Sequence, residues 1–85
     1  MNNGPAPFAP IPLAMAQEGE RLRIHLLRGG KGLEMRLTAL GLNLGTELTL
    51  IQRSGGGLVV LRGETRIALG PGMAHKIMVV RPHPE

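Results

Sequence analysis

The most regular stretch of the chain is residues 21–27, RLRIHLL, in which apolar and polar side chains alternate. Leu22, Ile24 and Leu26 occupy every second position, and arginine or histidine stands between them. A period of two is typical of a half-buried strand, because successive side chains of a strand point to opposite faces. The pattern predicts a strand with an apolar inner face and a cationic outer face that includes His25.

Residues 33–40 change to the spacing of a helix about two turns long. Its apolar face consists of Leu33, Leu37 and Leu40, at positions i, i+4 and i+7. Gly41 follows directly, where a helix often ends in a left-handed residue that glycine adopts at little cost. We therefore expect Gly41 to end the helix and Leu42 to fold back onto Leu37.

Two further strands follow, the first of them just after Gly45. Residues 46–53 place Leu48 and Leu50 on one side, and alternate again. Residues 58–69, LVVLRGETRIAL, predict a hairpin whose two-residue turn is Gly63-Glu64, the glycine-first order of a type II′ turn. In that register the facing pairs are Leu58 with Leu69, Val59 with Ala68, Val60 with Ile67, and Leu61 with Arg66.

The outer side of this hairpin carries Val59, Leu61 and Ala68, and is more apolar than a face in contact with water normally is. Two interpretations stay open. The helix and residues 13–16 could cover these side chains, or they could form a surface that binds another protein.

A last short strand is expected at residues 76–80, KIMVV, after a turn in GPGMAH. The sum is five short strands and one short helix, without the helical crossovers that parallel strands need. The sequence therefore predicts a mainly β fold in which five antiparallel strands roll into a small barrel.

Length and composition limit the domain organisation. With 85 residues there is room for one domain, which we place at residues 13–82, and four prolines in residues 1–12 predict a poorly ordered N-terminal tail. No cysteine is present, which excludes a disulfide scaffold, a thiolate zinc site and a cysteine nucleophile. No apolar run is long enough for a membrane span, and a cytoplasmic location is the simplest expectation.

Catalytic chemistry finds little support in the sequence. Ser54 is the single serine, and no aspartate exists to orient a base for it. No glutamate stands in an apolar stretch that would raise its pKa. For a divalent metal such as iron or zinc, His25 and His75 are the candidate ligands, but no two histidines have the close spacing of a shared site. We therefore expect that the protein is not an enzyme and requires no cofactor.

The order of these elements resembles the FeoA family of small SH3-like barrel proteins. The resemblance covers residues 13–81 and rests on GERLRI, a GG pair, RLTALGLNLGTELTLI, the hairpin around RGETRIAL, and AHKIMVV. It implies a non-enzymatic accessory of bacterial ferrous iron uptake that binds the cytoplasmic region of the transporter FeoB. The partner-binding residues expected on the hairpin are Val59, Leu61, Arg62, Arg66 and Ala68.

The net charge of +4 supports a rival hypothesis, because a basic barrel can bind the phosphates of RNA or DNA. The single aromatic residue, Phe8, lies in the expected tail, so the folded domain has no ring on which a base could stack. We therefore expect no nucleic-acid partner. A third hypothesis is a metal-sensing domain like the one in iron-dependent repressors, which share the barrel.

Overall fold

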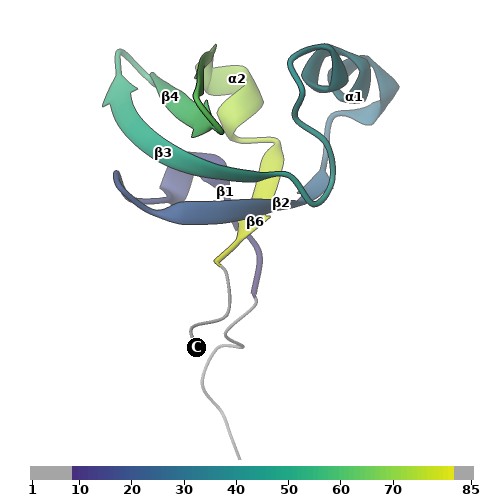
Figure 1. The fold of residues 1–85 in the computed structure, drawn as a ribbon. Coiled ribbons are helices and arrows are strands. Elements are labelled where there is room, and N and C mark those ends of the chain that lie inside the picture. The colour runs from purple at the N-terminus through teal and green to yellow at the C-terminus, as the bar shows by residue number, and fades with distance from the viewer. Residues whose placement is uncertain (1–8, 82–85) are drawn as a thin grey trace, which may run out of the picture.

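The computed structural model describes residues 9–81, and residues 1–8 of the expected tail lie outside them, as do residues 82–85. Six antiparallel strands form one curled sheet, with α1 at one end of it and α2 beside β4 (Figure 1). The strands are β1 (Ile11–Pro12), β2 (Arg21–Leu27), β3 (Glu47–Ser54), β4 (Gly57–Arg62), β5 (Thr65–Leu69) and β6 (Ile77–Val80). The helices are α1 (Gly30–Ala39) and α2 (Pro71–Ala74), and a 3-10 turn spans Leu13–Met15.

The mainly β fold class is confirmed, but the strand count of five is wrong. The sixth strand, β1, has two residues and pairs with β6, with Ile11 opposite Val79. It lies within the range expected to be tail, so the folded part begins at least two residues before Leu13. The strand order is β1-β6-β2-β3-β4-β5, and within residues 9–81 no ladder joins its two ends.

A second helix, α2, stands where only a turn was expected. Pro71 occupies its first position, where the missing N–H costs nothing because that group has no partner within a helix. The sequence did not indicate this helix because its four residues are too few to show a helical period.

The corner between α1 and β3 forms as the sequence predicts. The N–H of Gly41 donates to the carbonyl of Thr38 at 2.9 Å, and the N–H of Leu42 donates to that of Leu37 at 2.8 Å. These two bonds make a Schellman motif, and Gly41 takes the required positive φ of 81°. Leu37 and Leu42 are both fully buried in one core cluster, so the helix end is also an anchor in the interior.

Strand β2 departs from simple alternation at His25. Ile24 pairs with Val79 of β6, but Leu26 pairs with the adjacent Met78, so His25 is an extra residue in a β-bulge. A bulge reverses the facing of the residues after it, and Leu26 is 45% exposed. The expectation that Leu26 lies on the inner face is therefore wrong, whereas His25 is exposed as predicted.

The hairpin of β4 and β5 has the predicted register at every pair, from Leu58 opposite Leu69 to Leu61 opposite Arg66. Gly63 has a φ of 60°, and no non-glycine residue in the described chain has a positive φ. A type I′ turn would need a positive φ at Glu64 as well, so the type II′ prediction fits.

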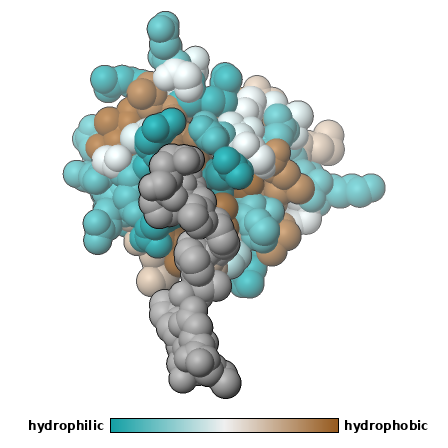
Figure 2. Space-filling model, turned by 60° about the horizontal axis from the view of Figure 1, so that its bottom comes forward, coloured by the Kyte–Doolittle hydropathy of each residue, from teal (hydrophilic) through white to brown (hydrophobic). Residues whose placement is uncertain are grey.

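The interior is aliphatic and holds no buried polar or charged side chain among the described residues. Of the predicted helix face, Leu37 is fully buried and Leu33 partly buried, but Leu40 is 38% exposed. The expectation that Leu40 belongs to the core is wrong, because it is the C-cap of α1 and the chain turns inward only at Leu42. Figure 2 shows apolar side chains, in brown, reaching the surface between polar ones.

An ion pair joins the C-terminal end of β6 to the start of β2. Arg81, just after β6, donates to both carboxylate oxygens of Glu20, just before β2, and the N–H of Gln17 donates to the same carboxylate. The hydrogen bond from Arg81 holds the pKa of Glu20 below its usual value of 4.5. Within residues 9–81, no helix is long and apolar enough to cross a bilayer.

We predict that Gly41→Ala lowers the free energy of unfolding by about 1–2 kcal/mol from backbone strain alone, because a left-handed conformation is costly for residues with a Cβ. That Cβ would also stand 2.8 Å from the guanidinium of Arg62, and because this is the far end of a flexible side chain, moving it should add only a small further loss. Chemical denaturation followed by circular dichroism measures the effect.

Gly45→Ala is the matched control for this prediction. Gly45 also has a positive φ, of 87°, but an added Cβ there meets no atom within 4 Å. Equal losses in the two variants would show that the contact of Arg62 with Gly41 contributes nothing.

A second prediction concerns pH. A lowered pKa in the folded state means that ionised Glu20 stabilises the fold above pH 4.5, and that this contribution disappears as the pH falls through the folded-state pKa. Glu20→Gln should therefore lower the free energy of unfolding by up to about 1 kcal/mol at neutral pH. The difference from the unmodified chain should vanish in strong acid, as measured by denaturation at several pH values. Glu34→Gln, which removes a carboxylate at an exposed position of α1, is the matched control.

Candidate functional site

The outer face of β4 and β5 brings together four of the five residues predicted to bind a partner. Leu61 faces Arg66, and Val59 faces Ala68, at alternate positions of the same hairpin. Val59 and Leu61 are half-buried, whereas Arg66 and Ala68 are exposed. We call these four residues the hairpin face.

The hairpin face continues across the sheet into β3 and β2. Thr49 of β3 pairs with Leu61 on one side and with Arg21 of β2 on the other. One row of side chains therefore runs from Arg21 through Thr49 and Leu61 to Arg66, with an arginine at each end. A hollow of about 160 Å³ lies over the part of this row near Leu61.

The charges around this face are only partly paired. Glu47 accepts a hydrogen bond from Arg23 at 3.1 Å and lies 4.0 Å from Arg21, and all three side chains are exposed by about half or more. Arg66 has no ion pair among the described residues. The face thus has an aliphatic centre and a net positive rim, which suits an apolar surface with acidic side chains around it.

Arg62, the fifth predicted residue, lies apart from the other four. It is one position beyond Leu61, pairs with Thr65, and therefore points to the opposite side of the sheet. Its guanidinium lies against Gly41, and its Nε atom is buried without a hydrogen-bond partner in the described chain. Arg62 packs the tip of the hairpin against the end of α1 and is no part of the hairpin face.

The two histidines proposed as metal ligands lie in different elements and are both exposed. His25 is in the bulge of β2, and His75 is the C-cap of α2. Within residues 9–81, no three histidine or glutamate side chains gather in a way that could hold a metal ion. A metal site at these histidines stays a prediction. The third histidine of the chain, His83, lies outside the described residues.

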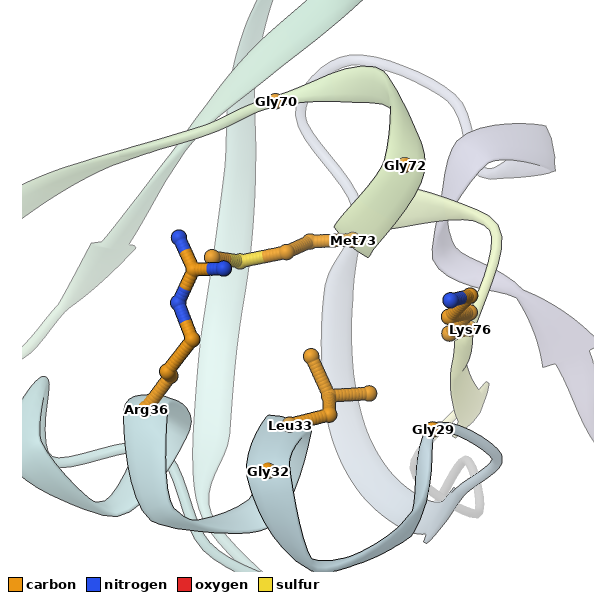
Figure 3. A pocket seen from close by; sticks show the side chains of 8 residues that line it. All are labelled: Gly29, Gly32, Leu33, Arg36, Gly70, Gly72, Met73 and Lys76. Carbon is orange, nitrogen blue, oxygen red and sulfur yellow. The ribbon is translucent and has the colours of Figure 1, made fainter.

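A groove of about 530 Å³ between α1 and α2 was not anticipated (Figure 3). It is lined by Gly29, Gly32, Leu33, Arg36, Gly70, Gly72, Met73 and Lys76. These residues come from two segments about forty positions apart, which the sequence analysis treated as turns and a helix. The available signal was their composition, because each segment combines glycines with a cation and an aliphatic side chain.

Comparison with known proteins places the whole described domain in one family. The model of the FeoA domain matches residues 11–81. A protein of Methanocaldococcus jannaschii named "Putative Fe(2+) transport protein A" is 38% identical over 68 residues, which cover 80% of this chain and 83% of that protein.

Solved structures agree with this result at the level of the fold. The crystal structure of the iron uptake regulatory protein FeoA has a TM-score of 0.79 and 24% identity, and the match covers 87% of this chain and 99% of that one. The zinc-bound structure of ScaR has a TM-score of 0.78 at 18% identity, but the match covers only 37% of that longer chain. The family match and the curated relative show that this chain belongs to the FeoA family.

Proposed function

We propose that this protein is a non-catalytic accessory of ferrous iron transport that binds the cytoplasmic region of the transporter FeoB. Membership of the FeoA family and the name of the relative from Methanocaldococcus jannaschii support the link to Fe(2+) transport. The proposed location is the cytoplasm, at the inner side of the membrane that holds the transporter.

The observation that carries the proposal is the composition of the hairpin face. An aliphatic centre of Val59, Leu61 and Ala68 reaches the surface. The pairing of β4 with β5 fixes the backbone that carries these three side chains. A rigid apolar patch with a polar rim is typical of the centre of a protein interface. We infer that the partner presents an apolar spot to this centre and acidic side chains to Arg21 and Arg66.

The environments of the carboxylates and of Ser54 support a role without catalysis. A general acid that works near neutral pH needs a raised pKa, but the hydrogen bond from Arg81 lowers the pKa of Glu20. Ser54 is exposed at the end of β3, and within residues 9–81 no carboxylate is buried. Binding, and not chemistry, is therefore the role that these side chains suit.

We predict that Ala68→Glu weakens binding to the purified cytoplasmic domain of FeoB by about tenfold, because it places a charge in the apolar centre. Ala68 is already exposed, so the fold should tolerate the change. Isothermal titration calorimetry measures the affinity. Arg66→Glu should weaken binding more at low salt than at high salt, because salt screens the interaction between exposed charges.

Met35→Glu is the matched control, since it adds the same charge at a side chain of α1 that is 73% exposed and lies away from the hairpin. Equal weakening by Ala68→Glu and Met35→Glu would contradict the hairpin face as the docking surface. Binding of this chain to a DNA or RNA oligonucleotide with a steep salt dependence, and none to the FeoB domain, would favour the nucleic-acid hypothesis instead.

A further inference from the structure

The groove between α1 and α2 is separate from the hairpin face and has a built floor. Leu33 of α1 and Met73 of α2 are partly buried against the core and face each other across it (Figure 3). A methionine side chain is flexible and adapts to different apolar partners. With a volume of about 530 Å³, the groove lies within the size range of ligand sites.

Glycines line the walls of the groove and leave it open. An added Cβ at Gly32, Gly70 or Gly72 would meet no atom within 4 Å. Packing against the rest of the protein therefore does not require glycine at these three positions. The effect of these glycines is to leave the backbone of both helices accessible to whatever enters the groove.

Two cations stand at the groove, one on each side of the apolar floor. Arg36, in the last turn of α1, extends toward the end of the Met73 side chain, and Lys76 lies on the other side of Leu33 (Figure 3). Both side chains are exposed, and neither forms an ion pair with a residue of the described chain. No acidic residue lines the groove, so its charge is uncompensated.

We propose that this groove binds an acidic peptide segment of a partner protein, with an aliphatic side chain between Leu33 and Met73 and carboxylates at Arg36 and Lys76. The charge of the lining selects against basic segments, and the apolar floor between the two cations provides area that a free inorganic anion would not use. The lining contains no aromatic side chain on which a nucleobase could stack. The proposal does not depend on the hairpin face or on the identity of its partner.

A titration of the isotopically labelled full chain with a short peptide of alternating glutamate and leucine tests the proposal by NMR. Amide shifts should concentrate in residues 29–36 and 70–76, and the same peptide with glutamine in place of glutamate should bind about tenfold more weakly. Shifts that concentrate on β4 and β5, or no binding at millimolar peptide, would overturn it.

Three variants separate this site from general attraction to a basic protein. Gly32→Leu fills the groove from α1 and should abolish peptide binding while the helix keeps or gains stability, since leucine is a better helix former than glycine. Arg36→Glu should weaken binding about tenfold, whereas Lys31→Glu, at an exposed position of α1 outside the lining, should change it little.

Three results would contradict the peptide site. The first is equal weakening by Arg36→Glu and Lys31→Glu, which would indicate only long-range attraction. The second is full binding by Gly32→Leu. The third is displacement of the peptide by inorganic phosphate at low millimolar concentration, which would indicate an anion site. Ala68→Glu should leave peptide binding unchanged, so failure here and failure of the hairpin face are distinguishable.

Discussion

The reversal of the chain at Gly41 and Leu42 is the constraint on which the other features depend. It ends α1, buries Leu37 and Leu42 together, and sends the chain into β3 within a few residues. Gly41 also lies against the guanidinium of Arg62, so the same corner contacts the tip of the β4–β5 hairpin. One backbone turn therefore connects α1, which forms one wall of the groove, with the tip of the hairpin that carries the hairpin face.

The two proposed binding surfaces use different physical means. The hairpin face is a flat patch whose rigidity comes from the ladders of β3, β4 and β5. The groove is a concave site between two helices, and it is open because glycines line its walls. Both combine an aliphatic centre with cations at the margin, so both suit apolar surfaces with acidic surroundings.

Sequence patterns predicted those parts of the fold that are determined by neighbours along the chain. The cap at Gly41, the strand of residues 46–53 and the register of the hairpin follow from local spacing and turn chemistry. The inward placement of Leu26 failed because the bulge at His25 is set by the register against β6, where Leu26 pairs with Met78, far away in the sequence. The placement of Leu40 failed because helical spacing does not show where the helix lies on the sheet.

The candidate sites show the same division. The alternation in residues 58–69 was enough to predict that Val59, Leu61, Arg66 and Ala68 share a face, because a strand fixes facing by parity. Parity would also have separated Arg62 from them. The groove could not be predicted, because it exists only where residues 29–36 and 70–76 meet in space.

The interior of the described domain is filled by aliphatic side chains. It contains no buried polar pair that would require particular residues to face each other. Such interiors accept many simultaneous exchanges among leucine, isoleucine and valine if the total volume is kept. Exchanges of this kind within this chain should therefore leave the path of its backbone unchanged, as long as Gly41 keeps its left-handed turn.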